Sequence, residues 1–133
     1  MLCAILGIAL VQVFAADKPL SFNHAIRPIL ADHCFTCHGQ DEKSRKGGLR
    51  LDVRDAAVKG GKSEKPAIVP GEPDRSELLA RLTTHDADDL MPPPEQKNPV
   101  SAQQIEDLKR WIREGAAYEG HWAYAAPEKN PVP

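Results

Sequence analysis

This chain has few aromatic side chains, no large excess of either charge and few long apolar runs. Aromatic residues make up 5% of its 133 residues, so a single small domain would have a thin apolar core. The formal net charge is −2, which argues against nucleic acid and against an anionic membrane surface as partners. The chain also has 12 prolines and 9 glycines. A small domain of this kind usually needs a staple, that is, a cross-link or a bound cofactor that adds stability to the core.

The longest apolar run covers residues 2–16, which are uncharged and end in small side chains before Asp17. This pattern is typical of a signal peptide, with cleavage after Ala15 or Ala16. The alternative is a membrane anchor, but the run is shorter than the roughly 20 apolar residues that a crossing requires. We therefore expect an exported, periplasmic or extracytoplasmic protein that meets a membrane only if this segment stays uncleaved. The expected division is residues 1–16 as signal, 17–118 as the folded domain and 119–133 as a tail or linker.

Strand-like alternation of apolar and polar residues is also missing, and helical spacing replaces it. We expect helices at residues 21–34, with a kink or restart at Pro28, at residues 52–58, ending before two glycines, and at residues 74–82. The clearest helix follows Ser101, which forms a capping box with Gln104, and it ends before Gly115. Val100 and Ile105 can staple its start. The fold class predicted is a small, mainly α domain.

The sequence Cys34-Phe-Thr-Cys37-His38 fits C-x-x-C-H, the motif of covalent haem attachment. Two cysteines three residues apart in a helical turn lie on one face, where they can form thioethers with the two vinyl groups along one porphyrin edge. The adjacent His38 is then held beneath the iron as its proximal axial ligand. The large apolar surface of a haem can also serve as the staple that a thin core needs.

Two other uses of these cysteines compete with haem. A disulfide or thioredoxin-like redox pair would be accompanied by βαβ units, which the sequence does not indicate. A zinc site could use both cysteines and His38, with His24, His33 or His85 as fourth ligand, but no second C-x-x-C pair completes the usual spacing. The motif therefore favours one covalently attached haem c with its iron.

Met91 is the leading candidate for the distal axial ligand, because it is the only methionine after the initiator and precedes three prolines. Prolines restrict the backbone before them, so the thioether would project from a stiff loop. Its alternative role is to fill a gap in the core, and His85 is the second candidate ligand. We expect the haem to be buried by apolar side chains and to meet a cation at its propionates; the candidate pocket residues are Leu49, Leu51, Leu108 and Trp111, with Arg50 or Lys46 as the cation.

Several segments together resemble planctomycete-type cytochrome c domains across nearly all of the chain after residue 16. They are FNHAIRPILADHCFTCHGQDEKSRKGGLRLDVRDAAVKGG, AIVPGEPDRSELLARL, LMPPP and LKRWIREGAAYEGHWAY. The resemblance implies a class I-like cytochrome c fold wrapped around one haem, thioethers at Cys34 and Cys37, and axial ligands at His38 and Met91. It also implies that such a domain commonly opens a much larger exported protein.

The function expected is that of an electron carrier, not an enzyme, in which iron cycles between ferric and ferrous while both axial positions are filled. Its partner would be an unidentified redox protein or a fused downstream domain. One alternative is an open-site haem enzyme or gas-binding domain, such as a peroxidase-like centre, in which Met91 does not occupy the iron. A less favoured alternative is a zinc-stapled binding module.

Overall fold

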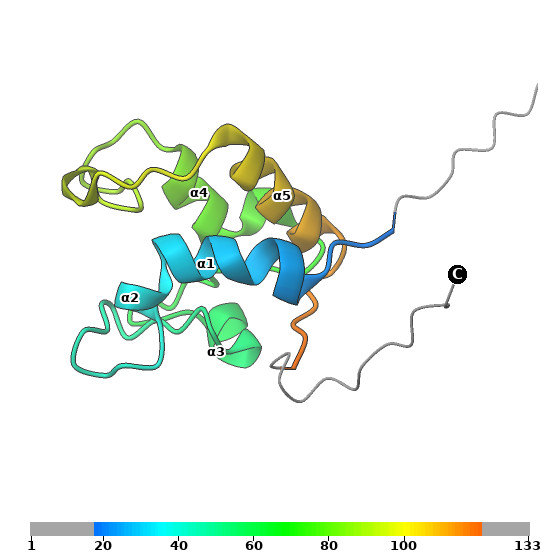
Figure 1. The fold of residues 1–133 in the computed structure, drawn as a ribbon. Helices are drawn as coiled ribbons and strands as arrows, with labels where there is room; N and C mark the ends of the chain where they lie inside the picture. Colours follow the sequence, from blue (N-terminus) through cyan, green and yellow to red (C-terminus); the bar gives the residue numbers. More distant parts are fainter. Residues whose placement is uncertain (1–17, 121–133) are drawn as a thin grey trace, which may run out of the picture.

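The computed structural model describes residues 18–120, and the secondary structure in this part of the chain is entirely helical. This confirms the prediction of a mainly α fold. Helix α1 (Arg27–His33) crosses the middle of the molecule, with α4 (Glu77–Thr83) and α5 (Ala102–Arg113) on one side and α2 (Phe35–His38) and α3 (Arg54–Lys59) on the other (Figure 1). The expected signal segment, residues 1–16, lies outside the described residues, as do residues 121–133 of the expected tail.

The first helical segment changes type at Pro28, where the sequence predicts a kink or restart. A π-helical turn, η1 (Phe22–Ile26), precedes α1, and the N–H of Arg27 donates to the carbonyl of Phe22. Proline has no N–H to donate to the carbonyl four residues earlier, so an α-helix could not continue unbroken through Pro28. The wider π turn absorbs this defect, and α1 then carries the chain to the cysteine motif.

Helix α4 begins three residues later than the sequence analysis expects. Residues Pro73–Arg75 form a separate 3₁₀ turn, η2, and the N-cap of α4 is Ser76. The Ser76 side chain does not cap the helix, because its Oγ accepts a hydrogen bond from the Val69 N–H at 2.9 Å and donates to the Glu72 carbonyl at 3.1 Å. Ser76 is 1% exposed. The hydroxyl thus fastens the preceding loop beneath the helix, a tertiary role that a local capping pattern does not reveal.

Helix α5 matches its prediction closely. Ser101 Oγ accepts from the Gln104 N–H at 3.2 Å, and Gln104 Oε1 accepts from the Ser101 N–H at 2.8 Å, which completes the capping box. The apolar stripe of this helix buries Leu108, Trp111 and Ile112. A further 3₁₀ turn, η3 (Pro94–Gln96), lies in the long loop before α5.

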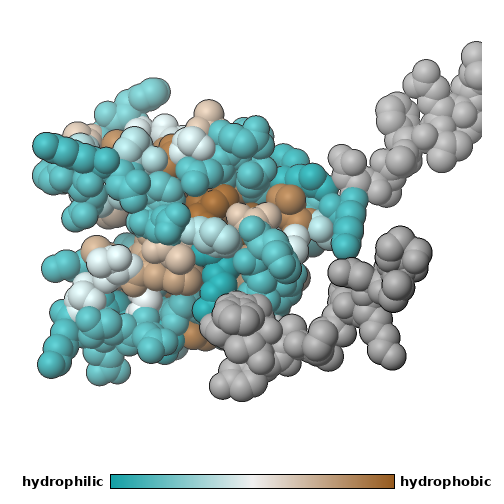
Figure 2. Space-filling model, in the orientation of Figure 1, coloured by the Kyte–Doolittle hydropathy of each residue, from teal (hydrophilic) through white to brown (hydrophobic). Residues whose placement is uncertain are grey.

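Three of the aromatic residues that the structure describes form one cluster. Phe22 stacks on Tyr118 with ring centroids 4.3 Å apart, and Trp111 lies 5.7 Å from Phe22 and 5.3 Å from Tyr118. Both polar tips are satisfied, since Trp111 Nε1 donates to the Ala117 carbonyl and the Tyr118 hydroxyl donates to the Leu51 carbonyl. The cluster joins both ends of the described chain to the loop that contains Leu51. In Figure 2, apolar side chains show in the band between the two halves of this mostly hydrophilic face.

The last described residues close over the start of η1. One carboxylate oxygen of Glu119 accepts from the Phe22 N–H at 3.0 Å, and the other accepts from the Asn23 N–H at 3.2 Å and the Ser21 hydroxyl at 3.1 Å. Asn23 Nδ2 also donates to the Gly120 carbonyl at 2.7 Å. Glu119 and Gly120, placed in the tail by the sequence analysis, therefore make specific contacts with the folded unit.

Between residues 18 and 120 we find no helix that combines the length and the apolar character needed to cross a membrane.

Replacing Glu119 by alanine should destabilise the protein by about 1 kcal/mol, the usual loss when a helix start loses its capping side chain. Burial raises the pKa of Glu119, but hydrogen bonds from Asn23, Ser21 and Phe22 outweigh burial and hold this pKa below its ordinary value. The Glu119 carboxylate therefore stabilises the folded protein fully at pH values above its ordinary pKa. This stabilisation is lost as the pH falls through the lowered pKa of the folded state. Urea unfolding at neutral and acidic pH measures it.

The matched control is Glu106→Ala, since Glu106 is an exposed glutamate of α5 outside this contact. Equal stability of Glu119→Ala and the unmodified protein, or a difference that persists unchanged at acidic pH, would contradict the capping role.

Candidate haem-binding site

The C-x-x-C-H motif occupies a single helical turn at the end of α1. Cys34 separates α1 from α2, and its carbonyl accepts hydrogen bonds from the Cys37 N–H at 3.1 Å and the His38 N–H at 2.8 Å. This turn brings residues 34 and 37 to one side of the backbone, as helical spacing requires. Both cysteines are free thiols and are partly buried.

Both cysteines, His38 and Met91 line one cavity of about 450 Å³. Its volume is within the range of sites that enclose cofactors, roughly 300–1,000 Å³. Much of its wall is apolar and comes from three segments distant in sequence, namely Leu49 and Leu51, Ala67, and Leu78 and Leu82 of α4, with Pro92 and Pro93 beside Met91. An apolar cavity with two thiols, an imidazole and a thioether on its wall fits a haem.

The environment of His38 suits a metal-binding imidazole. Burial lowers the pKa of His38, while the nearby backbone carbonyls of Lys46 and Leu49 act in the opposite direction. Its Nδ1 is buried and makes no hydrogen bond of good geometry. The net effect favours the neutral ring, which is the form that binds metals.

The environment of Cys34 differs from that of a redox-active cysteine. Burial raises the pKa of the Cys34 thiol to about 12, and the neighbouring Cys37 adds to this shift. Redox-active cysteines react as thiolates, so the surroundings of such a cysteine lower its pKa instead. Residues 18–120 also hold no group of three or more His, Cys, Asp or Glu side chains placed to bind a metal ion. The zinc-stapled module thus finds no support in this part of the chain.

Met91 reaches the cavity from the loop that follows α4. Its side chain is partly buried, and its N–H donates to the Arg81 carbonyl at 2.9 Å. The other candidate for the distal position, His85, is exposed and does not line the cavity. Of the two, Met91 alone shares a cavity with His38.

A second anchor holds the loop beyond Met91. His33, at the end of α1 and on the cavity wall, places Nδ1 3.1 Å from the Asn98 carbonyl, and Asn98 Nδ2 donates to the Asp32 carbonyl at 3.0 Å. The end of the motif helix and the chain after η3 are therefore joined directly. His33, which the sequence analysis considers only as a zinc ligand, instead ties the wall of the cavity together.

The expected pocket residues divide into two groups. Leu49 and Leu51 lie on the cavity wall. Leu108 and Trp111 do not, because the stripe of α5 faces the core, where each is 1% exposed. Arg50 also lies off the wall, since its guanidinium pairs with Asp52, with Nη2 and Oδ2 2.6 Å apart.

The cations that do line the cavity are Lys46, Lys65 and Arg81. Lys46 is among the predicted pocket residues, whereas Lys65, Arg81 and the α4 residues Leu78 and Leu82 are not. The spacing of Leu78 and Leu82, four residues apart on one helix face, was a usable signal for a shared wall. No comparable pattern marks Lys65 or Arg81.

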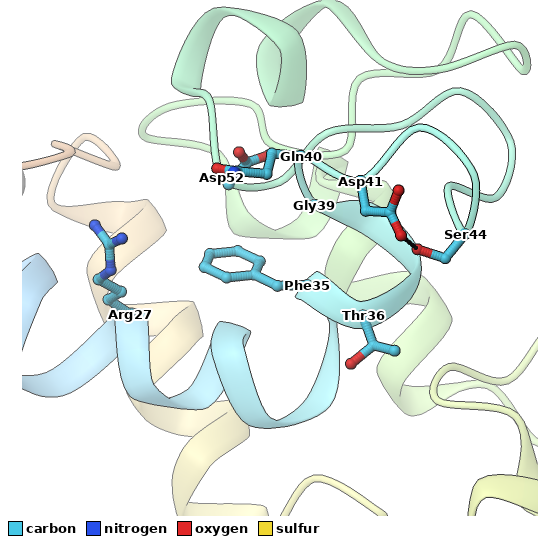
Figure 3. A pocket seen from close by; sticks show the side chains of 8 residues that line it. All are labelled: Arg27, Phe35, Thr36, Gly39, Gln40, Asp41, Ser44 and Asp52. Carbon is cyan, nitrogen blue, oxygen red and sulfur yellow. Dashed lines mark hydrogen bonds between the residues drawn. The ribbon is translucent and has the colours of Figure 1, made fainter.

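A second cavity, of about 390 Å³, lies beside α2 and is more polar (Figure 3). The Phe35 ring extends across it, Arg27 and Asp52 stand on its border, and Ser44 donates to Asp41 at 2.8 Å. None of its lining residues is a cysteine, histidine or methionine. It therefore offers no ligand set for a haem.

Comparison with known proteins agrees with this geometry. Residues 34–95 match the family described as planctomycete cytochrome C. No curated protein and no solved structure matches the chain significantly. The matched segment begins at Cys34 and runs past Met91, so it contains the cysteine motif, the apolar walls and the methionine loop. This segment of the chain is therefore similar to planctomycete-type cytochrome c, and the similarity supports a haem-binding domain of mainly α structure.

Proposed function

We propose that the domain is a mono-haem electron carrier, in which Cys34 and Cys37 hold one haem c through thioethers and His38 and Met91 are its axial ligands. The observation that carries this proposal is the shared cavity. Residues 34–38 and residue 91 are far apart in sequence, yet they line the same apolar space. A thioether and a neutral imidazole are the axial pair of many c-type cytochromes.

When bound, the haem supplies one-electron chemistry at its iron, and the chain controls the setting in which this happens. Two occupied axial positions leave no place for a substrate, so the domain itself would not be an enzyme. The apolar side chains of the wall, among them Leu49, Leu51 and Leu82, exclude water. Burial and His/Met ligation both raise the reduction potential relative to an exposed bis-histidine site.

We further propose that the domain works outside the cytoplasm and passes electrons to or from a redox protein or a fused downstream domain. The apolar segment at residues 2–16 supports the location, because it has the length and end of a signal peptide. The near-neutral charge supports neither nucleic acid nor an anionic membrane as the partner.

Met91→Ala should leave the haem attached but abolish the sulfur-to-iron charge-transfer band of the ferric protein and lower the reduction potential. The thiols and His38 are untouched, so only the distal ligand is lost. Absorption spectra and a pyridine haemochrome assay test this on protein exported with a haem-maturation system.

His85→Ala is the control, since His85 is the other candidate ligand and should not affect the band. If Met91→Ala keeps the band, Met91 is not the ligand. Rapid binding of carbon monoxide or cyanide by the unmodified protein, at neutral pH and without denaturant, would instead favour an open-site haem enzyme or gas-binding domain.

Replacing both Cys34 and Cys37 by serine should remove covalent haem, because the hydroxyl that replaces each thiol does not form the thioether. Denaturing electrophoresis with haem staining, together with the intact mass, measures attachment. Each single variant should keep one thioether and thus retain part of the staining. Unmodified protein that matures colourless, with free thiols or bound zinc, would refute haem attachment altogether.

A further inference from the structure

We propose that Arg81 is a positioning residue that holds Met91 against the haem cavity by clamping residues 85–91 to helix α4. This inference rests on the proposed function, in which Met91 is an axial ligand. Arg81 lines the cavity beside Met91 and uses both its backbone and its side chain to hold the loop.

The backbone part of the clamp acts on Met91 itself. The Arg81 carbonyl, in the last turn of α4, accepts the Met91 N–H at 2.9 Å. The next residue, Pro92, has no N–H and cannot add a second bond of this kind. The position of the Met91 backbone therefore depends on the helix end that Arg81 occupies.

The side-chain part of the clamp bridges the helix and the loop. Arg81 Nε donates to Glu77 Oε1 at 2.9 Å within α4, while Nη1 donates to Asp89 Oδ1 at 2.5 Å and lies 3.5 Å from the Asp89 carbonyl. The planar guanidinium can serve both carboxylates at once, which the single ammonium of lysine cannot reproduce in the same geometry. The Arg81 side chain is 32% exposed and that of Asp89 is 57% exposed, so solvent screens this pair in part.

The loop has few other attachments. The Asp86 N–H donates to Thr84 Oγ1, the Asp88 N–H donates to Asp86 Oδ1, and the Leu90 N–H donates to the Asp86 carbonyl. These bonds fold the loop on itself, and residues 85–89 are all exposed. Among residues 18–120, Arg81 is the only residue of α4 with hydrogen bonds to residues 85–91.

A clamp that exists only when the loop is closed must shift the balance between bound and displaced Met91. Its loss raises the fraction of molecules with a free distal position. An external ligand that needs that position then binds more tightly by the same factor. Imidazole binding to the ferric protein reports this factor directly.

The experiment compares the unmodified haem-loaded protein with Arg81→Lys, Asp89→Ala and the double variant at one neutral pH. We expect each single variant to bind imidazole roughly two- to fivefold more tightly, the effect of losing one partly exposed ion pair. The double variant should bind imidazole no more tightly than the single variant with the larger effect, because both changes break the same contact. Amide exchange at Leu90 and Met91 should quicken in all three.

Arg81→Lys separates positioning from charge, since a variant that keeps the positive charge at the cavity should still fail as a clamp. Asp89→Ala separates the loop contact from any direct contact of Arg81 with haem, because Asp89 does not line the cavity. Arg75→Ala is the matched control, as its pair with Glu72 is also on the protein surface but outside the cavity. It should bind imidazole like the unmodified protein.

Failure of this inference is distinct from failure of the proposed function. If the unmodified protein shows the charge-transfer band, Met91→Ala removes it, and Arg81→Lys and Asp89→Ala bind imidazole normally, the clamp is refuted and the ligand assignment stands. Additive effects in the double variant would also refute the clamp. If the unmodified protein lacks the band, the ligand assignment itself fails.

Discussion

The site depends on one helical turn that begins at the Cys34 carbonyl. Two thiols and an imidazole can face one cavity from five consecutive residues only if the backbone between them is helical, and the hydrogen bonds from Cys37 and His38 to that carbonyl impose this. The turn is held in place by α1, whose Ile29 and Leu30 are buried in the core. The cysteine motif is thus rigidly joined to the centre of the fold.

The remaining walls of the cavity depend on a core that is small but concentrated. Phe22, Trp111 and Tyr118 form one aromatic cluster, which joins η1, α5 and the last described segment. Tyr118 also fixes the Leu51 carbonyl, and Leu51 contributes both to the core and to the cavity wall. The core therefore positions the cavity, although the buried residues of α5, namely Leu108, Trp111 and Ile112, lie away from it.

The methionine side of the cavity is held differently. The motif side rests on buried apolar packing, whereas the loop that contains Met91 is exposed over most of its length and is held by polar contacts. Arg81 anchors the part before Met91, and Asn98 anchors the part after η3 to the end of α1. Segments with few buried apolar contacts open more easily than the core. The position of Met91 therefore depends on these polar anchors, which is why they matter to the proposed ligand.

Local patterns in the sequence determined the helical class, the cysteine turn and helix α5 with its capping box, because each depends on residues within one or two turns of each other. They also suggested His38, Met91, Leu49 and Leu51 as candidate site residues, and all four line the cavity. Tertiary structure alone decided that Leu108 and Trp111 face the core, that Arg50 turns to Asp52, and that Arg81 reaches Asp89. These outcomes depend on how the elements and loops pack in three dimensions, which helical periodicity does not specify.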